Sequence, residues 1–152
     1  MALPDIFSKP VADQIIARIN NLQADTQPQW GQMNANQVMA HCNVTYEMVY
    51  TDKHPAPFFP LSLILKLLVK KKVVSEVPYG NNSPTAPAFK TLGVYDFEAE
   101  RQRLIAYIQQ VQQEGRKTFE GKKSLSFGAL TAEEWNNMFY KHLHHHLTQF
   151  GV

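Results

Sequence analysis

The chain has 152 residues, of which 44% are hydrophobic and 18% charged, and its net charge is +2 at pH 7. This length suits one domain with its own core and is too short for two ordinary domains, so we expect a single domain over residues 1–152. The composition excludes a disordered tail. The small charge, without a groove-reading motif, argues against nucleic-acid binding.

The compartment is predicted from two features of the chain. The single cysteine, Cys42, excludes an internal disulfide and is typical of a reducing environment. The first residues lack the basic and apolar regions of a secretory signal peptide. We therefore expect a cytoplasmic protein that acts on a small molecule and does not insert stably into a membrane. The sequence leaves open whether it is a monomer or a homodimer.

Two helices are predicted in the first third of the chain. Over residues 8–22, apolar side chains recur on one face, Ser8 is a suitable N-cap and Pro10 suits the first turn. After a loop, Asn34 and Gln37 have the spacing of a capping box and predict the start of a second helix. In the apolar stripe of that helix, His41 stands where a core residue is expected.

The middle of the chain predicts a shorter helix and a loop. Residues 61–74 are apolar and include three consecutive lysines, Lys70 to Lys72, so we expect a third, shorter helix there. Residues 78–87 contain repeated Gly, Asn and Pro, which predict an extended loop.

The last third predicts two long helices. Asp96 is the expected N-cap of a helix that ends near Gly115, and a basic connector over residues 115–128 follows. Thr131 and Glu134 then form a second capping box before the last helix. We find no convincing period-2 strand pattern. The sequence therefore predicts an all-α fold of four principal helices plus the segment 61–74.

Histidines are the main candidates for chemistry. His142 and His146 are four residues apart, so they share one face of a helix and can reach one metal ion, with His41 as the best third ligand. Three histidines with one position left open are typical of a catalytic metal site. His144 should lie exposed on the opposite side, whereas His145 is adjacent to the ligand face and could support the ligands.

Two structural explanations compete with this interpretation. A histidine-rich helix end can simply be solvated, because cations near a C-terminus suit the helix dipole. A lone histidine on an apolar face, such as His41, can be a core residue whose polar atoms are satisfied.

Several known metal and nucleotide sites are excluded. A zinc protease helix needs Glu directly after the first His, where this chain has Leu143. A di-iron bundle needs two Glu-x-x-His motifs, and a nucleobase deaminase needs a Cys pair. The glycines and lysines of residues 115–123 resemble a phosphate loop, but Lys123 replaces the required Ser or Thr. Glu47 lies six residues after His41, on another face, so no general base is evident.

Two further segments have structural explanations. Cys42 follows His41, but neighbouring residues on a helix diverge by roughly 100°, so Cys42 is expected to be a small buried hydrophobe. The segment 60–74 could lie on a membrane surface because of its lysines. It is too short and too charged to span a membrane. The favoured interpretation is a covering helix with a solvated basic end.

Several stretches resemble the DinB/YfiT-like superfamily. Residues 33–41 (MNANQVMAH) and 140–151 (YKHLHHHLTQFG) resemble its two signature segments, and residues 82–87 with the helix start at 96–98 resemble an uncharacterised branch. The resemblance implies a cytoplasmic bacterial protein with an up-and-down four-helix bundle, an additional short helix and a long connecting loop. It also implies a divalent metal held by three histidines, which match His41, His142 and His146.

The resemblance implies a metal site more firmly than a reaction. Members include thiol S-transferases that use bacillithiol- or mycothiol-like cofactors and isomerases that use related thiols, while many have no known activity. We expect a divalent ion (zinc or nickel first, then manganese or iron) and a low-molecular-weight thiol as cofactors of an S-transferase acting on small electrophiles. A metal- or ligand-binding protein without activity, and a hydrolase in which the metal activates water, are the alternatives.

Overall fold

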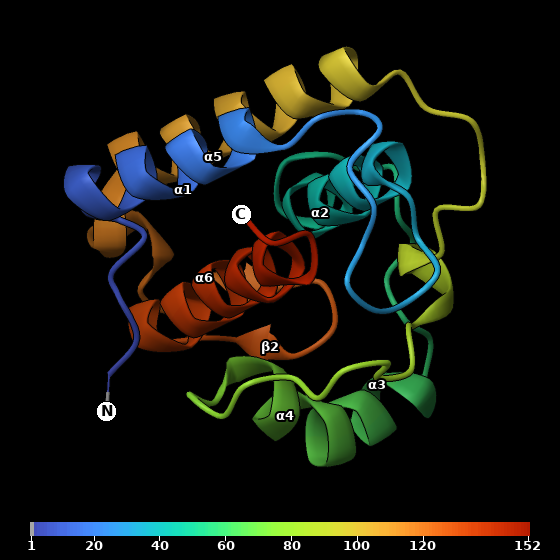
Figure 1. Ribbon diagram of the computed structural model, residues 1–152. Helices are drawn as coiled ribbons and strands as arrows, with labels where there is room; N and C mark the ends of the chain where they lie inside the picture. Colours follow the sequence, from blue (N-terminus) through green and yellow to red (C-terminus); the bar gives the residue numbers. More distant parts are fainter. Residues whose placement is uncertain (1) are drawn as a thin grey trace.

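The structure of the protein is a computed structural model that describes residues 2–152. Most of the chain is helical, as predicted, and four helices are long: α1 (Lys9–Asn21), α2 (Ala35–Tyr50), α5 (Phe97–Phe119) and α6 (Ala132–Gln149). Helices α1, α2 and α6 each contact α5, and α6 also contacts α1 and α2 (Figure 1). The four long helices therefore surround one shared core.

Large aromatic side chains from three of these helices fill the core. Tyr46 of α2 stacks on Phe139 of α6 with ring centroids 5.0 Å apart, and Phe119 of α5 meets Trp135 of α6 edge to face at 5.4 Å. All four are almost completely buried. Burying such a side chain stabilises the fold by about 1.5–3 kcal/mol, so α2, α5 and α6 are held at fixed positions relative to one another.

All four predicted N-cap residues stand at helix starts, and three of them cap the helix with their side chain. The capping boxes of Asn34 with Gln37 and of Thr131 with Glu134 are both complete, and the Asp96 side chain accepts from the backbone of the first turn of α5. Ser8 occupies the N-cap position of α1 and Pro10 lies in its first turn, as predicted, but the Ser8 side chain makes no hydrogen bond to the helix. Its hydroxyl instead donates to the backbone oxygen of Asp5 at 2.7 Å, because the chain turns just before the helix.

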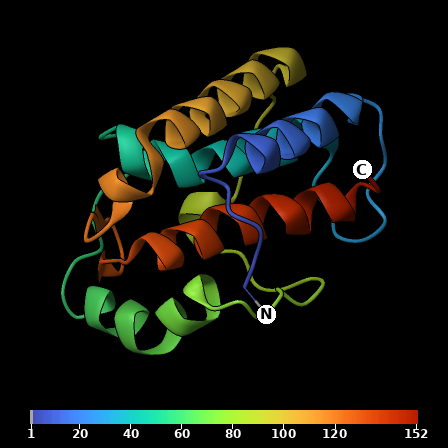
Figure 2. The same cartoon turned by 90° about the vertical axis from the view of Figure 1, so that its left-hand side faces the viewer.

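The predicted helix over residues 61–74 is present but is not uniform. It consists of α3 (Leu61–Ile64), a π-helical turn η1 (Leu65–Val69) and α4 (Lys70–Val74). This run contacts α6 through α4 and lies at the edge of the molecule, on the side of α6 away from α1 (Figures 1 and 2). Within the described residues, no helix is long and apolar enough to cross a membrane.

The connecting segment after α5 agrees with one prediction and corrects another. The regular part of α5 ends near Gly115, as predicted: the glycine adopts φ 69° and ψ 172°, a conformation that only glycine adopts readily, and a short helical turn follows as far as Phe119. The connector that follows contains a small antiparallel hairpin of β1 (Lys123–Ser124) and β2 (Gly128–Ala129). Strands of two residues are too short to show alternation in the sequence. A short 3-10 helix, η2 (Pro87–Phe89), ends the long loop.

Candidate metal centre

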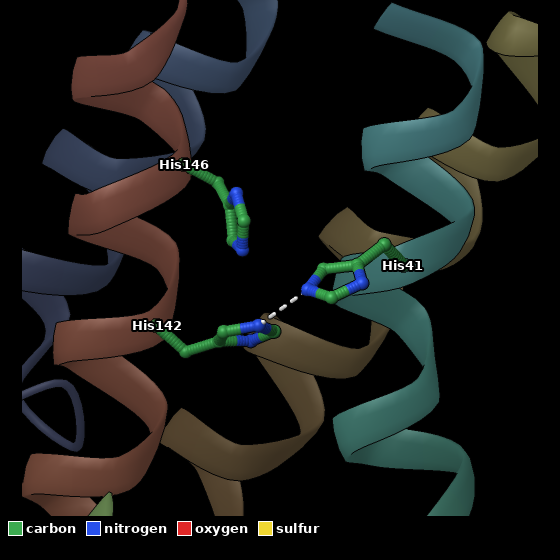
Figure 3. A group of neighbouring side chains, drawn as sticks. All are labelled: His41, His142 and His146. Atoms are coloured by element: carbon green, nitrogen blue, oxygen red, sulfur yellow. Dashed lines mark hydrogen bonds between the residues drawn. The ribbon is translucent and has the colours of Figure 1, made fainter. Parts of the chain in front are cut away.

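The structure brings three histidines together from two helices. His41 lies on α2, and His142 and His146 lie one turn apart on α6 (Figure 3). One ring nitrogen from each lies within 4.8 Å of the others, and the Nε2 atoms of His41 and His142 are 2.9 Å apart. His142 and His146 share one face of α6, as their spacing predicted, and His41 meets them because α2 packs against α6.

The cluster lies mostly inside the protein, with His142 half-buried. Only 4% of His41 and 8% of His146 is exposed. The ring of Phe89, which is half-buried, packs against those of His41 and His142 at 5.5 and 5.9 Å between centroids. The loop before α5 therefore covers one side of the cluster.

Backbone and amide oxygens determine which nitrogen of two rings carries the proton. Nδ1 of His41 lies 2.8 Å from the carbonyl oxygen of Phe89, and a carbonyl can only accept, so Nδ1 donates. Nδ1 of His146 lies 2.8 Å from Oε1 of Gln149. The orientation of that amide is set because its Nε2 donates to the carbonyl of Trp30 at 2.7 Å. In neutral rings of His41 and His146, the Nε2 atoms are then unprotonated.

His142 has a partner that suits either tautomer. Its Nδ1 lies 3.1 Å from the Thr45 hydroxyl, which can donate or accept. Without a cation, Nε2 of His142 must donate to the unprotonated Nε2 of His41. With a cation between the rings, Nδ1 of His142 donates to Thr45 instead, and all three Nε2 atoms present lone pairs to the cluster. Thr45 therefore allows His142 to act as a ligand without leaving a polar atom unsatisfied.

Burial keeps the three rings neutral. Loss of solvation lowers the pKa of His41 and, more strongly, that of His142, with a further lowering from neighbouring histidines. The same cause lowers the pKa of His146 to about 3. Metal ligation requires neutral imidazole, so the rings are already in the required state at neutral pH.

These residues fit a divalent metal ion. Neutral imidazole suits zinc, nickel, iron and related ions, and metal-bound histidines usually donate their other nitrogen to an oxygen, as His41 and His146 do here. The 4.8 Å spread of the ligand atoms slightly exceeds twice the zinc–nitrogen bond of about 2.0–2.1 Å, so binding would draw the rings closer together. A buried cluster that could hold a metal ion is thus present.

The two other C-terminal histidines lie outside the cluster. His144 is exposed on the other side of α6, as predicted, where its Nδ1 lies 2.9 Å from Nη1 of Arg18. His145 packs edge-on against His146 with centroids 5.0 Å apart. His145 also lines a small cavity, which none of the three clustered histidines lines.

Cys42 and Glu47 have structural roles. Burial raises the pKa of the Cys42 thiol to about 12, so it is not a nucleophile at neutral pH. Burial also raises the pKa of Glu47, but hydrogen bonds from Lys53, His54 and Arg103 outweigh this and hold the pKa below its usual value. Glu47 is therefore an ion-paired carboxylate and not a general base for the cluster.

Sequence reasoning missed three residues that orient the ligands. Thr45 follows His41 by four residues and Gln149 follows His146 by three, so helical spacing could have identified both. Nothing in the sequence marks Phe89, which lies 48 residues from His41 and acts through its backbone oxygen. A contact made by the backbone of a loop leaves no residue-type signal.

The fold and the site together define the class of protein. It is a mostly helical protein with a buried three-histidine cluster that could hold a metal ion. Residues 8–151 match the sequence model of the family described as protein of unknown function DUF1569, and the chain belongs to this family. No curated protein and no solved structure matches the chain. The relation to the DinB/YfiT-like superfamily therefore remains a proposal.

Proposed function

We propose that the protein is a DinB/YfiT-like four-helix-bundle enzyme in which His41, His142 and His146 bind a divalent metal ion, and that it transfers a thiol to a small electrophile. The observation that carries this proposal is the set of three neutral imidazoles whose Nδ1 atoms are all engaged by other groups. Such rings leave the metal its full charge. Three protein ligands also leave a position for a substrate.

The residues around the cluster favour thiol transfer over hydrolysis. A divalent ion lowers the pKa of a bound thiol, so that a thiolate is available at neutral pH. Hydrolysis benefits from a carboxylate base, but the described cluster consists of histidines only, and Glu47 is engaged in ion pairs. In the proposed reaction the thiol sulfur bonds to the electrophilic carbon, and the carbon–chlorine or epoxide carbon–oxygen bond breaks with its electron pair going to chlorine or oxygen. Chloride departs and the thiol proton passes to solvent, whereas an opened epoxide keeps its oxygen, which takes up a proton.

A cavity beside the cluster supports a small substrate. It has a volume of about 190 Å³, and its lining includes His145, whose ring packs against His146 of the cluster. Aromatic rings of Trp30, Tyr79 and Tyr140 line it. Flat apolar walls of this kind suit a small organic molecule better than a polymer.

A thiol panel tests this function. Metal-loaded protein is mixed with bacillithiol, mycothiol, glutathione or coenzyme A and a chlorinated or epoxide electrophile, and thioether product is measured. We expect turnover with at least one thiol, its loss in His41→Ala and His142→Ala, and its retention in the control Gln113→Ala, an exposed change on α5 outside the cavity. Circular dichroism checks that each variant folds.

Three results would contradict the proposal, and each would point to a different function or site. Absence of turnover with every thiol in fully metallated protein would indicate a metal-binding protein without transferase activity. Release of a hydrolysed electrophile, independent of thiol, would indicate a metal-dependent hydrolase. Turnover that survives both substitutions would place the chemistry outside the cluster.

A further inference from the structure

A large apolar surface lies on the outside of the segment 58–68. Phe58, Phe59, Leu67 and Leu68 are 72%, 79%, 70% and 75% exposed, and Leu61, Leu63 and Ile64 are between 39% and 47% exposed. We call these seven side chains the 58–68 apolar surface. Single exposed apolar residues are common, but a contiguous group of this size in a soluble domain usually marks a site of interaction.

The helical run over residues 61–74 is apolar on two sides. Its inner side packs toward the protein, where Val74 is buried and Leu65 and Val69 are half-buried. Its outer side carries the 58–68 apolar surface. A helix that is apolar all round is normally covered on every side, and within the described residues nothing covers the outer side of this run.

Contacts with α6 hold this surface toward the outside. The buried Lys141 side chain donates from Nζ to the carbonyl oxygens of Lys72 and Ser75 at 2.9 and 2.5 Å. Asn137 donates to the carbonyl of Val74 at 3.0 Å, and Lys70 pairs with Glu134 at 2.9 Å. The end of α4 is therefore fixed on α6, and the run projects at the edge of the molecule (Figure 2).

Positive charge accompanies the apolar surface. Lys66, Lys71 and Lys72 are exposed, and none of them takes part in an ion pair among residues 2–152. Residues 53–75 contain five lysines and no Asp or Glu. The exposed apolar groups are thus bordered by cations whose charge no neighbouring residue in the segment neutralises.

We propose that the 58–68 apolar surface docks onto an anionic lipid membrane. The phenylalanines and leucines enter the boundary between headgroups and acyl chains, and Lys66, Lys71 and Lys72 contact lipid phosphates. A second copy of this chain fits less well, because pairing two such surfaces would oppose lysines without acidic partners in the segment. The proposal concerns docking at the interface only and is independent of the function proposed for the histidine cluster.

Vesicle flotation tests this proposal with the full chain. The vesicles contain phosphatidylcholine alone or phosphatidylcholine with about one third phosphatidylglycerol, a source of anionic surface potential. We expect binding to the anionic vesicles only, and weaker binding as salt rises. Leu67→Gln/Leu68→Gln should weaken binding about a hundredfold, because two leucines no longer leave water. Lys71→Gln/Lys72→Gln should weaken it about fivefold per lysine.

Matched variants control for general surface effects. Leu92→Gln/Val94→Gln removes two side chains that are 82% and 103% exposed but lie outside the segment, and it should bind as the wild type does. Lys90→Gln/Lys117→Gln is the corresponding charge control. All four substitution pairs lie on exposed side chains, and unchanged thermal unfolding shows that each variant is folded.

Four results would overturn the proposal. The first is that the wild type does not bind anionic vesicles, and the second is that it binds neutral vesicles equally well. The third is that the control variants lose as much binding as the variants of the segment. The fourth is that the protein forms a dimer without vesicles and that this dimer dissociates in Leu67→Gln/Leu68→Gln. The last result would show that the surface joins two copies of the chain.

Discussion

The Nε2 atoms of His41 and His142 face each other at 2.9 Å across the contact between α2 and α6. Because Nδ1 of His41 donates to Phe89, the neutral His41 ring has only a lone pair to offer at this contact. The contact is satisfied only when a proton of His142 or a cation lies between the rings. The protein can therefore exist in a metal-free form and a metal-bound form, and several predictions rest on this pair.

Metal content should depend on the clustered histidines alone. Protein purified without chelator or affinity resin is expected to carry a divalent ion, measured by elemental analysis. His41→Ala, His142→Ala and His146→Ala should lose it, because each removes one of three ligands. His144→Ala should retain it, since that ring lies exposed beside Arg18. Loss of metal in His144→Ala but not in His142→Ala would contradict this assignment.

Chelation should lower the melting temperature. A ligand at a hundred times its dissociation constant stabilises the folded state by about 2.7 kcal/mol, and about 1 kcal/mol corresponds to roughly 2–4 °C in a chain of this size. We expect EDTA to lower the melting temperature by about 5–10 °C in differential scanning calorimetry. The same treatment should leave His142→Ala unchanged, and an equal shift in that variant would point to another metal site.

Gln149 should control metal affinity without binding the metal. Gln149→Met removes the acceptor of the His146 Nδ1 proton and the hydrogen bond to Trp30. Loss of such a partner typically weakens metal binding about 10–100-fold, which isothermal titration of the metal-free protein would measure. Gln113→Met, an exposed change on α5, is the matched control. Equal affinities in the two variants would show that Gln149 does not orient the ligand.

The metal-free protein should lose stability in mild acid. Burial lowers the pKa of His41, His142 and His146 in the folded state, so below about pH 6.5 the unfolded chain binds more protons than the folded one. The free energy of unfolding therefore decreases as the pH is lowered, by up to about 1.4 kcal/mol per pH unit for each titrating group.

Urea unfolding in EDTA at pH 7 and pH 5 measures this loss. His146→Leu should show a smaller difference between the two pH values, because one group with a lowered pKa is gone. A wild-type stability that does not change between these pH values would mean that the rings are not buried as neutral groups.

Lys141 should hold α4 in place. Lys141→Met removes both hydrogen bonds to the carbonyls of Lys72 and Ser75, so the end of α4 should open more often. We expect faster trypsin cleavage at Lys70 to Lys72 than in the control Lys117→Met. Burial lowers the pKa of Lys141 to about 8, and replacing a buried cation with Met partly offsets the lost contacts. Local proteolysis is therefore a clearer readout than global stability.

Much of the fold could be predicted from local patterns. The capping boxes at Asn34 and Thr131 and the cap at Asp96 mark helix starts because a cap involves residues within one turn. The hairpin after Phe119 and the π-helical turn at Leu65–Val69 could not be predicted in the same way. Both are too short to show a repeating pattern of side chains, and Ser8 shows that a suitable cap residue can find another partner.

For the site, helical spacing alone predicts that His142 and His146 share a face, because both lie on one helix. That His41 meets them is decided by the packing of α2 on α6, and the protonation of each ring is decided by Phe89, Thr45 and Gln149. The exposure of the 58–68 apolar surface is likewise a tertiary property, since its sequence suits a buried helix equally well. Local periodicity determines which side chains share a face, whereas burial, tautomer and solvent access depend on neighbours that are distant in the chain.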